Sequence, residues 1–156
     1  MQDMVESFGF IFLLSKRFEY ITDQALAKDE LTTKQLLTLI AIERGFQTIP
    51  SISQVADVLS TTHQNVKKIA LQLEKKKFIE IVRDKNDKRR LLLKTTQRNQ
   101  EYWDSRAPEH LQAIQDLFNP LSVDEIHSFN LLLKKLIEGV DGKFLSKSKK
   151  EPTRQS

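Results

Sequence analysis

The spacing of apolar residues changes from a helical to an alternating pattern near residue 77, and this change limits the possible folds more than any other feature. From Thr62 to about Lys76 the apolar residues recur on one narrow helix face and are Val66, Ile69, Ala70 and Leu73. Residues 78–83 and 90–95 are rich in β-formers and flank a polar loop. The patterns predict an amphipathic helix followed by a β-hairpin with a charged tip.

A largely apolar helix is predicted further upstream, where Thr32 or Thr33 can serve as its N-cap and Gly45 ends it. Apolar residues lie around most of its circumference, which is typical of a central, buried helix. These residues are Leu36, Leu37, Leu39, Ile40 and Ile42.

A short helix that Ser53 can cap runs from there to Leu59, and a break at residues 60–62 separates it from the helix that begins at Thr62. A turn of three to four residues between two short helices is the spacing of a helix-turn-helix. Because a hairpin follows, the sequence predicts a winged helix-turn-helix.

Long helices are expected on both sides of this unit. One covers about residues 5–27, and another starts at Thr96 and is bent or interrupted at Pro108. Ser122 and Glu125 form a capping box for a last helix. Residues 141–156 are basic and poor in apolar side chains, so we expect a flexible tail. The predicted fold class is therefore mainly α with a small β-hairpin wing (α+β).

The composition excludes several kinds of protein. The chain contains no cysteine, which rules out disulfides, thiolate metal sites and cysteine redox switches. The longest uncharged stretch of the first predicted helix, Ser7–Ser15, is much shorter than the ~20 residues that span a bilayer. Acidic residues precede this stretch, where a secretory signal has basic ones. We therefore expect a cytoplasmic protein without a membrane partner.

Positive charge is concentrated in one window of the chain. Residues 62–95 contain 11 basic and 4 acidic side chains, whereas the whole chain has a net charge of only +4. Such a concentration is typical of a surface that binds a polyanion. A solvated lysine-rich helix face is the plain alternative.

The helix that begins at Thr62 is narrow enough to enter the major groove of double-stranded DNA. Gln64 and Asn65 are candidate base readers, because an amide can bond an adenine edge through two hydrogen bonds. His63 could contact either a base or a phosphate. Side chains that suit phosphate contacts, which position the protein without reading the sequence, are Thr61, Thr62, Lys67 and Lys68.

The predicted tip of the hairpin carries the cations Lys88, Arg89 and Arg90. An arginine on such a tip fits the narrow minor groove, where the potential is most negative. Because a lone carboxylate would be repelled by phosphate, we expect Asp84 or Asp87 to be the ion-pair partner that holds Arg89 in reach. The alternative is a turn-forming aspartate beside a solvated arginine.

No pattern in the sequence indicates an enzyme, a cofactor or a bound metal. The three histidines, at positions 63, 110 and 127, are too dispersed for a zinc site. Phosphate-binding glycine loops, nucleophile elbows and zinc-protease motifs are absent from the sequence. Tyr102 and Trp103 could line a ligand pocket, although aromatic residues on a long helix more often pack in a core or a dimer interface.

Residues 31–100 resemble the MarR (multiple-antibiotic-resistance regulator) family of bacterial winged-helix transcription factors. The resemblance rests on the segments Leu31–Gln35, Ser53–Leu59, Thr62–Val66 and Leu73–Lys76, and above all on the wing pattern Asp84-x-x-Asp87-Lys88-Arg89. One departure is Lys77, which stands where the family usually has the glycine that ends the reading helix. A strained or altered turn is therefore expected at this position.

The resemblance implies a homodimer with two regions besides the predicted tail. Residues 1–30 and 96–140 would form the helical dimerisation region, and residues 31–95 the DNA-binding domain. Members of the family bind pseudo-palindromic operators, mostly as repressors. Many release DNA when a small anionic or phenolic ligand binds, so a small aromatic or anionic effector is a candidate partner besides DNA. Another reading is a winged-helix interaction module whose basic face binds an acidic protein.

Overall fold

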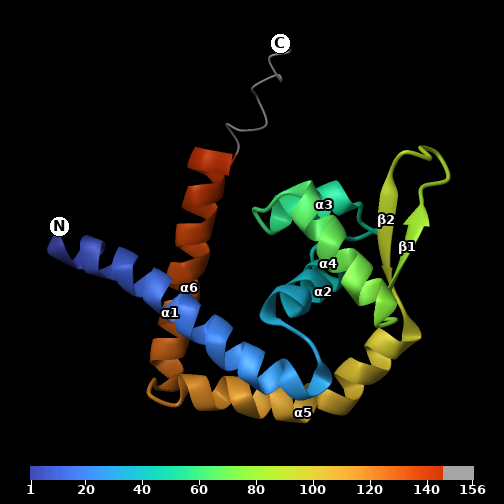
Figure 1. Ribbon diagram of the computed structural model, residues 1–156. Helices are drawn as coiled ribbons and strands as arrows, with labels where there is room; N and C mark the ends of the chain where they lie inside the picture. The colour runs from blue at the N-terminus through green and yellow to red at the C-terminus, as the bar shows by residue number, and fades with distance from the viewer. Residues whose placement is uncertain (146–156) are drawn as a thin grey trace. The chain divides into compact units, whose positions relative to one another are not determined.

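Figure 1 shows the computed structural model of the protein, which describes residues 1–145. The described chain forms two compact units, of which the first covers residues 1–105 and the second begins at Arg106, within helix α5. Its elements are α1 (Gln2–Leu26), η1 (Ala27–Asp29), α2 (Thr33–Arg44), α3 (Ile52–Val58), α4 (His63–Lys75), β1 (Ile79–Arg83), β2 (Leu91–Thr95), α5 (Gln97–Phe118), α6 (Val123–Val140) and η2 (Asp141–Leu145).

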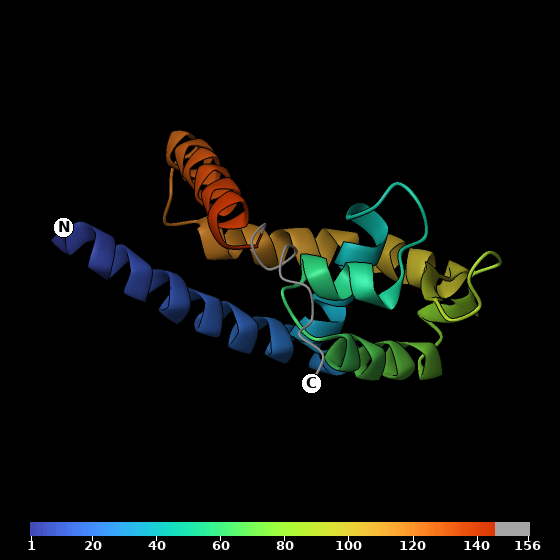
Figure 2. The ribbon, with the colours of Figure 1, turned by 90° about the horizontal axis from the view of Figure 1, so that it is seen from above.

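This element order confirms the predicted fold class, a mainly helical chain with one β-hairpin. The strands pair antiparallel, from Ile79 opposite Thr95 to Arg83 opposite Leu91. The hairpin lies at the outer edge of the first unit, in the view of Figure 1 and from above in Figure 2. Residues 141–145 are π-helical, and the rest of the predicted tail lies outside the described residues.

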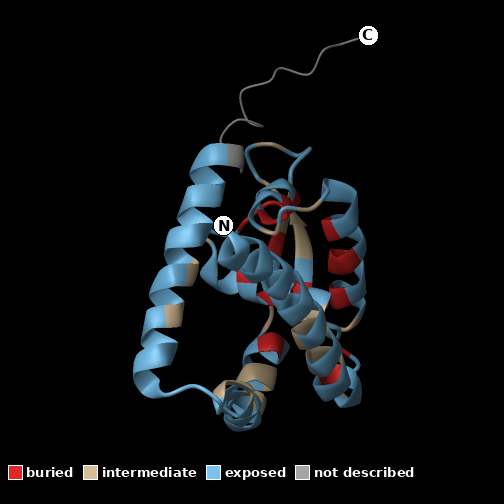
Figure 3. Ribbon diagram, turned by 90° about the vertical axis from the view of Figure 1, so that its left-hand side faces the viewer, coloured by how far each residue is buried: buried red, intermediate tan, exposed pale blue. Residues whose placement is uncertain are grey.

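The core of the first unit is built from α2, α3, α4 and the hairpin. The predicted stripe of α4 is buried throughout, and Val66, Ala70 and Leu73 are completely inaccessible to solvent. Leu39 of α2 and Leu93 of β2 are equally buried and belong to the same core. Figure 3 shows the buried residues gathered in these elements, whereas α6 is exposed along most of its length.

Helix α3 begins two residues earlier than the sequence suggests, so the prediction that Ser53 caps it is wrong. Ser51 is the N-cap: its hydroxyl accepts from the Gln54 amide N–H at 3.3 Å, and Gln54 Oε1 accepts from the Ser51 N–H at 2.9 Å. The extended chain at Pro50 also joins the sheet, because its carbonyl accepts from Leu93 N at 2.8 Å. This pairing places Ser51, and not Ser53, at the start of the helix.

A further expectation was wrong. Helix α2 is not buried all round, because Leu37 and Ile40 are exposed on a side that the core does not cover. At Pro108, where a bend or an interruption was expected, helix α5 is not interrupted. A proline removes one main-chain hydrogen bond of a helix, and the remaining bonds on both sides keep the helix intact here.

Helix α4 ends in a Schellman motif in which Lys77 adopts the left-handed conformation, with φ of 64°. The Phe78 N–H donates to the Leu73 carbonyl at 3.0 Å, and the Lys77 N–H donates to the Glu74 carbonyl at 2.8 Å. A residue with a Cβ is strained in this conformation by roughly 1–2 kcal/mol. The strain expected from the sequence at Lys77 is therefore present.

Lys77→Gly is expected to raise the free energy of unfolding by about 1 kcal/mol, because glycine removes the strain but is more flexible in the unfolded chain. Urea unfolding at constant protein concentration measures the difference. Lys75→Gly is the matched control: Lys75 lies in the last turn of α4, where glycine costs about 1 kcal/mol. Equal destabilisation by both variants would contradict the argument.

Candidate nucleic-acid interface

The first turn of α4 presents polar side chains to solvent. Thr62 is the N-cap, and its hydroxyl accepts from the Asn65 N–H at 3.2 Å. Thr61 is half-buried, whereas the other predicted contact residues of this helix are exposed: Thr62, His63, Gln64, Asn65, Lys67 and Lys68. The exposed side of α4 also carries one large apolar residue, Leu71. The helix thus buries its apolar stripe and exposes amides and cations.

Polar contacts between helices hold α4 against α2. The buried Gln35 side chain donates from Nε2 to Gln72 Oε1 at 3.0 Å and accepts from Lys76 Nζ at 3.1 Å. Lys76 also donates to the Glu30 carbonyl, at the end of the segment that precedes α2. No local pattern in the sequence indicates this network, because its members are 37 to 46 residues apart. Its effect is to orient the exposed face of α4.

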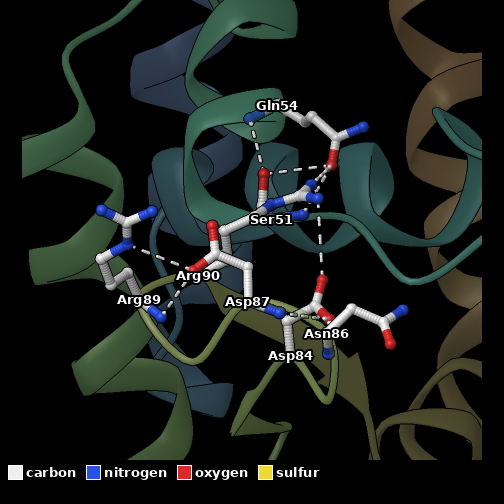
Figure 4. A network of polar contacts seen from close by, with 7 residues as sticks. All are labelled: Ser51, Gln54, Asp84, Asn86, Asp87, Arg89 and Arg90. Atoms are coloured by element: carbon white, nitrogen blue, oxygen red, sulfur yellow. Dashed lines mark hydrogen bonds and ion pairs between the residues drawn. The ribbon is translucent and has the colours of Figure 1, made fainter.

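The loop between the strands is organised by Asp84. Its Oδ1 accepts from the Asn86 N–H at 2.8 Å and from the Asp87 N–H at 3.4 Å, and its own N–H donates to the Arg90 carbonyl at 3.0 Å. The Arg83 guanidinium donates to the Lys88 carbonyl at 3.2 Å. Figure 4 shows the Asp84 carboxylate at the base of the loop and the Arg89 side chain pointing away from it.

The two loop carboxylates pair with different arginines. Arg89 Nε lies 3.4 Å from Asp87 Oδ1, and the Arg89 side chain is 94% exposed. Arg90 Nη1 lies 3.6 Å from Asp84 Oδ2, and its Nη2 donates to Gln54 Oε1 at 3.4 Å. Arg90 therefore links the wing to α3, through the amide that also caps this helix (Figure 4). Lys88 is exposed at the tip.

The hydrogen bond from the Asn86 N–H holds the pKa of Asp84 below its ordinary value, and the Asp87 N–H and the positive charge of Arg90 act in the same direction. A carboxyl group whose pKa is lowered by folding stabilises the fold above its ordinary pKa. This contribution disappears as the pH falls through the lowered pKa and the group is protonated.

Asp84→Asn is therefore expected to lower the stability at pH 7, and the difference from the wild type should shrink as the pH falls towards 2. Asparagine resembles the protonated carboxyl group, so the two proteins become alike once Asp84 is neutral. Urea unfolding midpoints measured for both proteins across this pH range provide the test. A difference that stays constant with pH would show that the charge of Asp84 does not support the loop.

Within residues 1–145 no cluster of three or more histidine, aspartate or glutamate side chains could hold a metal ion. Over the same residues no helix has the length and apolar character required to span a bilayer. Tyr102 and Trp103 pack partly buried against the core, where the Tyr102 hydroxyl donates to Asp29 Oδ2 at 3.2 Å and the Trp103 indole donates to Asn99 Oδ1 at 3.2 Å.

Comparison with known proteins agrees with this description. Residues 30–90 match the sequence model of the MarR family. A search of curated proteins finds no significant match to the chain. Among solved structures, a MarR protein from Peptoclostridium difficile has a TM-score of 0.78 at 20% identity and covers 89% of this chain and 90% of that one.

Two further structures come from proteins studied with DNA or with a regulator of DNA binding. A mutant MarR from E. coli, in complex with operator DNA, has a TM-score of 0.74 at 21% identity, with coverage of 86% of this chain and 95% of that one. BpsR from Bordetella bronchiseptica, whose DNA binding is regulated by 6-hydroxynicotinic acid, has a TM-score of 0.73 at 21% identity, with coverage of 84% and 98%. At identities this low, the structural likeness establishes a shared fold alone.

The matched segment contains α2, the helix-turn-helix, β1 and the loop of the wing, and the shared fold extends over more than four-fifths of the chain. Residues 30–90 thus form a domain that matches the MarR family.

Proposed function

We propose that the protein is a sequence-specific transcriptional regulator that binds double-stranded DNA as a homodimer. The first turn of α4 would enter the major groove, and Arg89 would enter the adjacent minor groove. One observation carries this proposal: the start of α4 and the tip of the wing are both exposed and belong to the same unit. They lie on the same side of that unit, the upper side in Figure 1. The operator complex of the E. coli relative supports it by analogy.

The link between Arg90 and Gln54 supports a division of roles within the wing. Arg90 is engaged by Asp84 and by α3, whereas Arg89 is almost fully exposed at the tip. We therefore assign the minor-groove contact to Arg89, with Asp87 as its partner, and the orientation of the wing to Arg90. Lys67, Lys68 and Lys88 would contact phosphates.

The proposed dimer would join the first and last helices of two copies. In the first half of α1 the large apolar side chains are between 41% and 68% exposed, and α6 carries a further exposed set that includes Leu132 and Ile137. Neighbouring apolar side chains that a single chain leaves this exposed mark an interaction surface. A two-fold dimer would bind a pseudo-palindromic operator whose half-sites are about one DNA turn, ~34–36 Å, apart.

Repression is the proposed mode of regulation. The cytoplasm is the proposed place of action, because such a regulator must reach chromosomal DNA.

A small aromatic or anionic effector is proposed by analogy with the relative whose DNA binding is regulated by 6-hydroxynicotinic acid. Adding this compound to the DNA complex of the present protein is a first test, with dissociation as the expected result and unchanged binding as the contrary one.

The decisive experiment is a titration of random-sequence duplex DNA at several salt concentrations. DNA binding predicts that the logarithm of the affinity falls linearly with the logarithm of the salt concentration, by roughly 0.9 per phosphate contact. Absent or salt-independent binding would contradict the proposal and favour an interaction module that binds an acidic protein. Selection of sites from the same random DNA then reports symmetry and half-site spacing.

A further inference from the structure

The side chain of Asn65 is already oriented in the DNA-free protein. Its Nδ2 donates to the Thr61 hydroxyl at 2.9 Å, while its main-chain N–H donates to the Thr62 hydroxyl at 3.2 Å. Both ends of this exposed residue are therefore bonded to the turn that precedes α4. Gln64, its neighbour, makes no side-chain hydrogen bond to any other residue of the described chain, 1–145.

Thr61 can orient Asn65 because its own backbone is fixed. The Thr61 N–H donates to the carbonyl of the buried Ala56 at 3.0 Å, and the Ser60 N–H donates to the Asp57 carbonyl at 3.2 Å. Ser60 has φ of 50°, so these bonds form a Schellman motif that ends α3. The backbone that carries the Thr61 hydroxyl is thus fixed by α3, a helix packed into the core.

The bond to Thr61 leaves Asn65 with its Oδ1 acceptor and its second Nδ2 hydrogen. This pair matches the major-groove edge of adenine, which offers a donor at N6 and an acceptor at N7. Guanine offers two acceptors there, so one of the two bonds would be lost. The Thr61 hydroxyl keeps its own proton and can donate it to a phosphate oxygen, a contact that would place the turn on the DNA backbone.

We propose that Asn65 reads an adenine in each half-site, that Thr61 is the positioning residue for its amide, and that Gln64 contributes little to base discrimination. The inference rests on the proposed function. An amide that is oriented in advance loses less conformational freedom on binding than the Gln64 side chain, which has no such hydrogen bond and one more rotatable bond.

The test compares binding to a selected operator with binding to the same duplex after one A·T pair has been replaced by G·C. Every position of the half-site is replaced in turn. For the wild type, replacement of the pair read by Asn65 should lower the affinity about 10- to 100-fold. Asn65→Ala should abolish this preference at that position alone, and Gln64→Ala should leave all preferences unchanged.

Thr61→Val keeps the shape of the side chain but removes the hydroxyl, and it should reduce the preference to about threefold or less. Thr61→Ser keeps the hydroxyl and should restore the preference. In the Asn65→Ala background Thr61→Val should have no further effect on the preference. Loss of a phosphate contact alone would weaken binding to all sequences equally and would leave the ratio of the A·T and G·C affinities unchanged. Circular dichroism checks that each variant folds.

Three outcomes would overturn the inference. Thr61→Val could keep the full preference for A·T, or Gln64→Ala could lose this preference while Asn65→Ala keeps it. The third is a base other than adenine at the affected position. Salt-dependent binding of random duplex DNA would persist in each of these outcomes, so the proposed function would stand. If the wild type binds no duplex DNA, both the proposed function and this inference fail.

Discussion

Phe8→Glu is expected to convert the protein from a dimer into a monomer, with a dissociation constant about 100- to 10,000-fold higher. The Phe8 side chain is 65% exposed in the single chain and packs edge-to-face on Phe12, with ring centroids 5.0 Å apart. Burial of one phenylalanine contributes about 1.5–3 kcal/mol. A two-fold interface contains the residue twice, which doubles the loss.

Sedimentation at micromolar concentration measures the change in mass. Gln24→Glu is a matched control, because Gln24 is an exposed residue of the same helix and the substitution introduces the same charge. Unchanged circular dichroism would show that the fold survives in both variants. A Phe8→Glu protein that still sediments as a dimer would place the interface elsewhere, and a monomeric wild type would contradict the proposed dimer itself.

Arg89→Glu is expected to weaken binding to duplex DNA by about 100-fold or more at 0.1 M salt. The substitution replaces a cation by an anion at the tip that would enter the most negative part of the DNA surface. Because the Arg89 side chain is 94% exposed, the stability of the protein should change little. The slope of affinity against salt should also decrease, since fewer counterions are released.

Lys85→Glu changes the net charge by the same amount on the same exposed loop. If Arg89 makes a specific contact, Lys85→Glu should weaken binding much less than Arg89→Glu, and fluorescence anisotropy with one labelled duplex can compare the two. Equal losses would mean that the wing acts through its overall charge and that Arg89 has no special role.

Much of the DNA-binding domain could be predicted from the sequence because its patterns are local. The buried stripe of α4 follows from apolar residues three and four positions apart, and the N-cap Thr62 lies next to the helix that it caps. The strain at Lys77 was also predictable, because a lysine followed the helix where the resembled family has glycine. In each case the interacting residues are fewer than about ten positions apart.

The errors arose where distant segments compete with a local pattern. Ser53 has the residue type and position of an N-cap, but the bond between Pro50 and Leu93 places Ser51 there. The exposed side of α2, with Leu37 and Ile40, shows that apolar composition does not report which faces a single chain covers.

The amino-acid order alone indicates which segments are helices or strands and where the cations gather, because hydrogen bonds and apolar spacing within an element depend on near neighbours. It could name Asp84 and Asp87 as candidate partners of the wing arginines, but not assign each pair. That assignment depends on Arg90 meeting Gln54, 36 positions away. Such a contact forms only when the packed core brings α3 and the hairpin together, and no local spacing encodes it.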